Sequence, residues 1–357
     1  MTVAAPTSAL WDRVDALIDA APGLQALRAH RLQLLAGRRW RETGVEVPEA
    51  LRAEERLAAV RDAIAPDLLG RVRAATDQPL VLLKGPEIAR RYPGHALRHF
   101  IDLDLLVPDA DRLQAELLAA GFELAEGPAW AFRLADDRDL FVDKHHCHPL
   151  RWAGWPLRIE IHRRPSWPGW LPQPPAERFL ELAEPAQEEE GILTLPPGPH
   201  ALVLAAHLWV SNPFARLRDA LDVALLLEEA ERGEVEALAR EWGVDRLWAT
   251  TSAVVESVLL GGRRPAAQRL WGRHLASARE QTVLEIHTTR WASPFWALPP
   301  HRAIRVAAAG VARDLRPAVA EPWGPKLRRS LRALGNARAP KSEHEEELGP
   351  EGRQLGR

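Results

Sequence analysis

Apolar residues recur with the spacing of an α-helix through the first part of the chain, from about residue 8 to residue 73. The spacing is interrupted near Gly37 and again between residues 45 and 48, where a proline occurs. We therefore predict a helical N-terminal region over residues 1–78. The residues that define the pattern include Leu10, Val14, Leu17, Ile18, Leu24, Leu27, Leu32 and Leu35.

A different pattern begins at residue 79. Residues 79–85 form a short apolar run that ends in Lys84-Gly85, which predicts a buried strand followed by a tight turn. A short helix is predicted over residues 86–92. Residues 100–108 then alternate apolar and acidic side chains with the period of two that a strand requires, and residues 109–120 predict a helix.

Further strands are predicted downstream with patterns of unequal strength. Residues 122–126, 129–134 and 140–146 are weaker candidates, whereas residues 157–162 alternate clearly and contain two isoleucines. Together with the preceding elements these strands predict a small mixed α/β core over residues 79–165.

The rest of the chain is predicted to be mainly helical. Proline-rich stretches at residues 165–175 and 196–199 mark connections, and apolar residues return to helical spacing over residues 200–290. We predict a mainly helical C-terminal region over residues 166–338. Residues 339–357 are charged and poor in large apolar side chains, which predicts a disordered tail.

The composition is that of an ordinary folded protein with nearly balanced charge. The chain has 47 Lys and Arg residues against 49 Asp and Glu residues, so no overall positive field favours a long nucleic acid as partner. The single cysteine, Cys147, excludes an intramolecular disulfide. The N-terminus lacks the features of a signal peptide, and no apolar stretch approaches the length of about 20 residues that a membrane span needs. We expect a cytoplasmic protein without a membrane partner.

Three acidic residues stand out in the predicted strands. Asp102 and Asp104 lie two apart, so both carboxylates project from one strand face, and Glu160 lies in the middle of a later strand. Carboxylates held this close raise one another's pKa, and a divalent cation between them makes the arrangement favourable. Three carboxylates that meet on neighbouring strands can hold two Mg²⁺ ions. The alternative is that the Asp-Leu-Asp sequence lies on a solvated sheet face.

The turn upstream of these carboxylates offers groups that bind phosphate. Lys84 supplies an ammonium, and the predicted helix that starts at Pro86 presents free N–H groups at its first turn. Lys84 has a second interpretation as a salt-bridging residue at the end of the sheet.

These features occur in the order found in a known family. The chain contains LLKGPEIARRYPGHALRHFIDLDLLVP, then a helix and Gly121-Phe122, and then HHCHPL and IEIHRR. This part, about residues 79–165, resembles the uncharacterised nucleotidyltransferase family of the DNA polymerase β-like nucleotidyltransferase superfamily. A weaker likeness continues into HALVLAAHLW and LRDALDVALLL, which look like the helical C-terminal portion of that family.

The resemblance implies a fold and a site. The fold is α+β, with a small mixed β-sheet nucleotidyltransferase core flanked by N- and C-terminal helical regions. In the superfamily a glycine-containing turn precedes an Asp-x-Asp strand, and a later strand supplies a third acidic residue. Gly85, Asp102, Asp104 and Glu160 match these positions, so the last three are the implied metal ligands and catalytic residues. The turn departs from the usual Gly-Ser or Gly-Gly, and the interval from Gly85 to Asp102 is longer than the superfamily norm.

The resemblance also implies a reaction. It is Mg²⁺-dependent transfer of a nucleoside monophosphate from an NTP co-substrate to a hydroxyl of a protein, peptide or small-molecule acceptor, with two Mg²⁺ ions as cofactors. Lys84, Gly85 and Arg98 would steer the triphosphate, and His162 would bind the nucleotide or assist proton transfer. Arg98 could instead pair with an aspartate, and His162 could be structural. Two other functions fit the same residues: an inactive module that binds or regulates, and a phosphotransferase.

Other polar and aromatic residues have open interpretations. Residues 145–148 contain three histidines and Cys147, but adjacent strand residues face opposite ways, which disfavours zinc; His146 or His148 could line the cleft instead. Asp219 and Asp222 are predicted to form salt bridges on a helix surface, with contact to the cleft as the alternative. Four tryptophans are predicted to pack a loop over the sheet, with base stacking as the alternative. They are Trp152, Trp155, Trp167 and Trp170.

Overall fold

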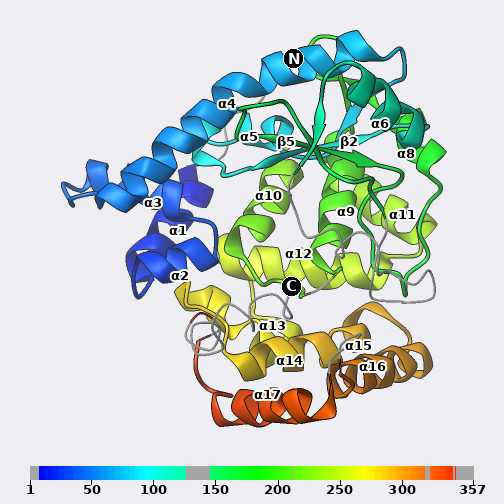
Figure 1. Cartoon of the computed structure of the whole chain (residues 1–357). Coiled ribbons are helices and arrows are strands. Elements are labelled where there is room, and N and C mark those ends of the chain that lie inside the picture. Colours follow the sequence, from blue (N-terminus) through cyan, green and yellow to red (C-terminus); the bar gives the residue numbers. More distant parts are fainter. Residues whose placement is uncertain (1–7, 126–144, 211, 318–321, 341, 343–357) are drawn as a thin grey trace.

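One mixed β-sheet lies in the upper part of the view in Figure 1, and helices cover both of its faces. This architecture confirms the predicted α+β class. The computed structural model describes residues 8–125, 145–210, 212–317, 322–340 and 342.

The sheet has seven strands in the order β3-β4-β5-β2-β1-β7-β6. The central strand β2 pairs in parallel with β5 and antiparallel with β1, and β1 pairs in parallel with β7. The outer strands β6 and β7 come from beyond the predicted core, whose boundaries at residues 79 and 165 stay a prediction. The strands span Val81–Leu82 (β1), Asp102–Leu106 (β2), Glu123–Leu124 (β3), Leu150–Arg151 (β4), Arg158–His162 (β5), Glu184–Pro185 (β6) and Leu193–Thr194 (β7).

Helices α4 (Glu49–Ala75) and α6 (Ala110–Ala119) cover one face of the sheet, and α4 runs along the top of the view in Figure 1. Because strand side chains alternate, every second residue of β2 and β5 is apolar and is buried against these helices. Asp109 caps the N-terminus of α6, because its carboxylate accepts a hydrogen bond from the backbone N–H of Arg112 at 2.9 Å. The residues that make this core include Leu68, Leu69, Val72, Leu103, Leu105, Leu113, Leu117, Ile159 and Ile161.

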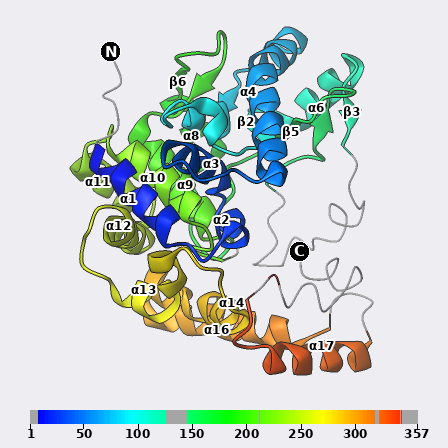
Figure 2. The ribbon, with the colours of Figure 1, turned by 90° about the vertical axis from the view of Figure 1, so that its left-hand side faces the viewer.

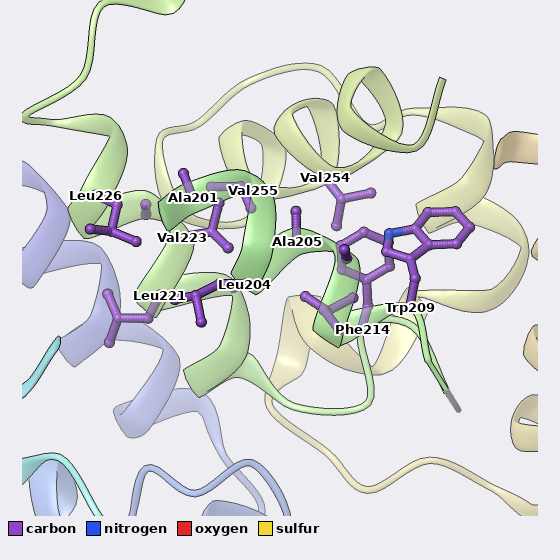
Figure 3. Packing of buried hydrophobic residues seen from close by; sticks show 14 of the residues in the cluster. Ala201, Leu204, Ala205, Trp209, Phe214, Leu221, Val223, Leu226, Val254 and Val255 are labelled. Carbon is purple, nitrogen blue, oxygen red and sulfur yellow. The ribbon is translucent and has the colours of Figure 1, made fainter. Parts of the chain in front are cut away.

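Helices α9 (Pro197–Leu208) and α10 (Leu217–Leu227) lie beneath the opposite face of the sheet (Figure 1). Helix α12 (Asp245–Leu259) packs under them, with α11 (Arg232–Glu241) beside it. Small and large apolar side chains of α9, α10 and α12 interlock there (Figure 3), and this cluster reaches the sheet at Val81 and Leu106.

Three short helices begin the described chain: α1 (Ser8–Ala20), α2 (Leu24–Ala29) and α3 (Gln33–Glu42). They pack beside α10 and α12, as Figure 2 shows, and Leu10, Val14 and Leu17 belong to the same buried cluster as those helices. The N-terminal segment therefore reaches the helices that cover the lower face of the sheet.

The C-terminal helices form a further layer on the far side of α12 from the sheet (Figures 1 and 2). No described helix has both the length and the apolar character that crossing a membrane requires. These helices are α13 (Ala266–Trp271), α14 (Val283–Ala292), α15 (Pro294–Ala297), α16 (Pro300–Leu315) and α17 (Trp323–Gly335). The remaining short elements are α5 (Pro86–Ala89), η1 (His95–Leu97), α8 (Ala176–Leu182) and η2 (Arg273–Ser277).

The strands predicted over residues 100–108 and 157–162 correspond to β2 and β5. The weaker prediction over residues 122–126 contains β3. Residues 129–134 and nearly all of 140–146 lie outside the described residues, as does most of the predicted tail over residues 339–357.

Candidate functional site

Two parallel neighbouring strands bring the predicted carboxylates together. Strand β2 pairs with β5 in a register that sets Asp104 opposite Glu160 and Leu106 opposite His162. Leu106 belongs to the cluster formed with α9 and α10, so the alternate residues Asp102 and Asp104 share the face that these helices cover. Asp104 is only 2% exposed, which excludes the solvated-face interpretation for this residue.

The most compact group of candidate ligands consists of Asp104, Glu160 and His162, whose ligand atoms all lie within 4.8 Å of one another. His162 Nε2 lies 3.0 Å from Asp104 Oδ1 and 4.0 Å from Glu160 Oε2. Asp104 Oδ2 is buried and has no hydrogen-bond partner. Asp102 lies on the same strand face outside this compact group, so the structure adds His162 to the predicted carboxylates as a candidate ligand.

The three carboxylates carry more negative charge than their surroundings compensate. Burial, followed by the charges of Asp104 and Asp102, raises the pKa of Glu160 to about 8. Burial and the charge of Asp104 likewise raise the pKa of Asp102. Burial also acts to raise the pKa of Asp104, but Lys84 and His162 outweigh it and hold this pKa well below its usual range.

The neighbouring imidazoles do not supply the missing positive charge. Burial lowers the pKa of His162 to about 4 in spite of its hydrogen bond to Asp104, and burial followed by the charge of Lys84 depresses the pKa of His207 strongly. Both rings are therefore neutral near pH 7. The buried oxygen of Asp104 without a partner and the excess of carboxylates fit a divalent cation, which prefers oxygen ligands of this kind.

Lys84 lies at the end of β1, directly beside the carboxylates. Its Nζ is 3.3 Å from Asp104 Oδ1 and 3.4 Å from His207 Nε2 on α9. Two turns earlier on α9, His200 Nε2 donates a hydrogen bond of 2.6 Å to the carbonyl of Leu83. Lys84 therefore makes the salt bridge that its second interpretation predicted.

The two histidines of α9 were not singled out in the sequence. Their seven-residue spacing within HALVLAAHLW places them on one helix face, and this is the signal that could have found them. They anchor α9 to β1 and bring an imidazole to Lys84.

Gly85 makes the predicted tight turn after β1. Its φ of 74° and ψ of −126° require glycine, and an added Cβ would lie 3.3 Å from Leu103 Cδ2 and 3.4 Å from the carbonyl oxygen of Asp102. The turn thus passes directly against the backbone of the first aspartate. The following helix α5 has only four residues, all buried, so its N-terminus lends no support to the predicted anion site.

The structure places Arg98 in a buried ion pair with Asp222 of α10. Nε and Nη2 of Arg98 donate to the two carboxylate oxygens at 3.0 and 2.7 Å, and Nη1 donates to the carbonyl of Gly85 at 3.4 Å. Tyr92 donates to the same carboxylate at 2.8 Å. Asp222 is 4% exposed, so the prediction of a surface salt bridge is wrong for this residue. The nucleotide-binding role of Arg98 stays a prediction; its contacts position the Gly85 turn.

The histidine run beside β5 gathers around His162. The rings of His145 and His146 lie 5.0 and 5.6 Å from the ring of His162, measured between centroids. His148 turns away and its Nε2 lies 3.0 Å from the carbonyl of Ala125. Within the described residues, no member of this run belongs to a group of three close ligand atoms.

The tryptophans of the segments that follow β4 and β5 have packing contacts. Trp167 and Trp170 are buried, and the indole N–H of Trp167 donates to the carbonyl of Pro172 at 2.8 Å. Trp152 lies edge-on to Phe122 and under the guanidinium of Arg71, which also approaches Trp155. These contacts fit the predicted packing of a loop rather than base stacking.

The sequence model of a protein family described as uncharacterised nucleotidyltransferase matches residues 18–259. This match spans more than half of the chain and contains every candidate site residue described above. The chain belongs to this family. No curated protein and no solved structure matches it. Membership in the uncharacterised nucleotidyltransferase family supports general nucleotidyl transfer, and the helices from α13 to α17 lie outside the matched residues.

Proposed function

We propose that this family member is a Mg²⁺-dependent nucleotidyltransferase of the DNA polymerase β-like superfamily. It moves a nucleoside monophosphate from an NTP to a hydroxyl of a protein, peptide or small-molecule acceptor. The observation that carries the proposal is the carboxylate face of β2 and β5, where Asp104 keeps a buried oxygen without a partner. Such an arrangement is costly without a cation.

Asp102, Asp104 and Glu160 would hold two Mg²⁺ ions on this face. Bound there, the cations would polarise the triphosphate and lower the pKa of the attacking hydroxyl. His162 Nε2 donates a hydrogen bond to Asp104 Oδ1 and so fixes the orientation of that carboxylate. The side chain of Glu160 is 22% exposed against 3% for Asp104, which places Glu160 on the accessible side of the site.

The reaction is an in-line displacement at the α-phosphorus of the NTP. The acceptor oxygen forms a bond to this phosphorus, the bond from phosphorus to the bridging oxygen breaks, and pyrophosphate leaves with the electron pair. Glu160 takes the proton from the acceptor hydroxyl, because its side chain is more exposed than that of Asp104.

The turn after β1 would hold the triphosphate. The ammonium of Lys84 lies 3.3 Å from Asp104 Oδ1, so it can bind a phosphate oxygen that enters beside that carboxylate. Gly85 lets the backbone pass close to β2, and Arg98 holds the turn through its hydrogen bond to the Gly85 carbonyl.

Calorimetric titration with each of the four NTPs in the presence of Mg²⁺ tests this proposal. We expect the wild type to bind at least one NTP and Asp102→Ala/Asp104→Ala to bind none. The matched control is Glu234→Ala/Glu236→Ala, which removes two exposed carboxylates of α11 and should bind as the wild type does. If the wild type binds no NTP, the transferase mechanism fails and an inactive binding module becomes the better interpretation.

The position of a radioactive label separates the proposed reaction from phosphotransfer. In nucleotidyl transfer the α-phosphate of the NTP enters the product, whereas a kinase would transfer the γ-phosphate. Incubation of the protein with cell extract and either labelled NTP, with Asp102→Ala/Asp104→Ala as the control, measures which phosphate is incorporated.

A further inference from the structure

Three arginines from two separate parts of the chain gather at the Asp102 end of the carboxylate face. Arg31 lies in the turn between α2 and α3, and Arg216 and Arg218 lie at the start of α10. The positive charges of Arg218 and Arg216 and the negative charges of Asp219 and Asp102 all act on the guanidinium of Arg31. These positions lie far apart in the sequence, so only the fold brings them together.

Backbone and imidazole hydrogen bonds fix Arg31 in this place. The N–H of Arg218 donates to the carbonyl of His30 at 3.2 Å, and the N–H of Leu217 donates to His30 Nδ1 at 3.2 Å. His30 Nε2 in turn donates to the carbonyl of Arg279 at 2.8 Å. His30 is therefore a positioning residue that locks the α2–α3 turn against the start of α10.

The start of α10 is tied in the same way to the start of β2. Nη1 of Arg218 donates to the carbonyl of His99 at 2.9 Å, three residues before Asp102. His99 Nδ1 is buried and has no hydrogen-bond partner. The arginine cluster thus borders the proposed metal site directly.

Among the described residues, two of the three guanidiniums form no hydrogen bond or ion pair, although the charge of Asp219 acts on all three. Arg218 binds Asp219 at 2.9 Å. Arg31 and Arg216 are half-buried, yet no hydrogen bond or ion pair joins either guanidinium to another residue of the described chain. Burial, then the charges of Arg218 and Arg216, lowers the pKa of Arg31 to about 9, so the cations repel one another.

The backbone at Arg31 is also strained. Its φ of 57° lies in the left-handed region, which disfavours any residue with a Cβ by roughly 1 kcal/mol. Glycine would relieve this strain, so local stability does not account for an arginine at this position.

We infer that Arg31 and Arg216 bind a phosphate group of a ligand beside Asp102. Guanidinium forks match phosphate oxygens in geometry and charge, and a phosphate would compensate two cations that the described chain leaves without partners. The inference rests on the proposed function, because it gives the same site a second set of contacts. The phosphate belongs either to the NTP or to a phosphorylated acceptor.

Calorimetric titration with inorganic tripolyphosphate at low ionic strength and without divalent cations tests the site. We expect the wild type to bind and the variants Arg31→Gly and Arg216→Gln each to bind roughly tenfold more weakly, the effect of losing one charge-assisted contact. Arg240→Gln on α11, which removes an exposed arginine elsewhere, should bind like the wild type.

Arg31→Gly separates binding from folding. Because glycine accepts the positive φ, its thermal unfolding midpoint should equal or exceed that of the wild type while its anion affinity falls. A purely structural role for the guanidinium would lower both quantities together and would overturn the inference. It is also overturned if the wild type fails to bind tripolyphosphate, or if both variants bind it as tightly as the wild type.

Competition with Mg²⁺-ATP identifies the source of the phosphate. Displacement of tripolyphosphate by Mg²⁺-ATP supports the site and assigns it to the nucleotide; simultaneous binding supports it and assigns it to the acceptor. The failure of the proposed function can be distinguished from the failure of this inference. A protein that binds no NTP with Mg²⁺ can still bind tripolyphosphate and lose that binding in the two arginine variants.

Discussion

Two buried clusters of charged side chains lie on either side of the Gly85 turn, and they differ in how completely their charges are matched. One joins Arg98 to Asp222, and the other gathers the carboxylates of β2 and β5 around Lys84. Both are formed by segments distant in sequence. Their difference separates a part of the molecule that is complete by itself from a part that requires a ligand.

The first cluster satisfies its charges internally. Both carboxylate oxygens of Asp222 accept hydrogen bonds from Arg98, and one of them also accepts from Tyr92. The guanidinium in turn reaches the carbonyl of Gly85. One cation faces one anion with nearly ideal geometry, and the result is a rigid link between α10 and the turn.

The second cluster leaves its charges unmatched. Three carboxylates face the single ammonium of Lys84, and burial keeps the nearby imidazoles of His162 and His207 neutral. The arginines that could balance Asp102 form no ion pair with it. A matched buried pair indicates structure, whereas an unmatched group of buried charges indicates a place where a cation and an anionic substrate complete the protein.

The largest expected effect comes from breaking the matched pair. Arg98→Met leaves the carboxylate of Asp222 buried without its cation, and we expect the free energy of unfolding to fall by about 3–5 kcal/mol. Urea unfolding followed by tryptophan fluorescence measures the loss. The double variant Arg98→Met/Asp222→Leu should recover much of it, because no uncompensated charge remains.

The double variant also tests the comparison itself. If the pair acts only by fixing the turn, the double variant should fold yet bind NTP more weakly, since the Gly85 turn loses a contact. A double variant that is no more stable than Arg98→Met would contradict the interpretation of a self-contained ion pair.

A smaller effect is expected from the unmatched cluster. Its ionised carboxylates should destabilise the metal-free folded protein, whereas the Arg98–Asp222 pair stabilises it. Glu160 has a pKa of about 8 in the folded protein against an ordinary value of 4.5, so the folded state binds a proton more tightly than the unfolded state does. Its contribution to stability is complete below pH 4.5 and is lost as the pH rises through about 8. The metal-free wild type should therefore lose stability across this range.

Glu160→Gln removes this dependence because glutamine has no charge to titrate. Thermal unfolding of metal-free protein between pH 5 and pH 9 should show a flatter profile for the variant than for the wild type. Glu236→Gln, at an exposed site on α11, serves as the control and should keep the wild-type slope. Identical slopes for wild type and Glu160→Gln would show that burial and the neighbouring aspartates do not raise the pKa of Glu160.

The sequence was sufficient for the features that depend on local periodicity. The alternation around Asp102 and Asp104 places both on one strand face, and the same alternation places Glu160 and His162 together. Glycine before the acidic strand predicted a turn that only glycine can make. These inferences need only the geometry of a single strand or turn.

The partners of these residues could not be predicted, because they depend on how distant elements pack. Arg98 and Asp222 are separated by 124 residues, and nothing in the local pattern of either one identifies the other. His207 reaches Lys84 only because α9 packs beneath the sheet. Arg31 becomes part of the site through the bond from α10 to His30. Each of these contacts is a property of the tertiary fold.

The smallest expected effect concerns the third member of the matched cluster. Tyr92→Phe removes one hydrogen bond of 2.8 Å to Asp222, but Arg98 still satisfies both carboxylate oxygens. We therefore expect a loss of about 1.5 kcal/mol in the free energy of unfolding, at the low end for a hydrogen bond to a charged group. Urea unfolding measures this loss, and Mg²⁺-NTP calorimetry should give the wild-type affinity because the turn keeps its bond from Arg98. A loss as large as that of Arg98→Met would mean that the hydroxyl of Tyr92, and not the guanidinium of Arg98, holds Asp222 in place. The ion pair would then not be complete by itself, and the contrast between the two clusters would fail.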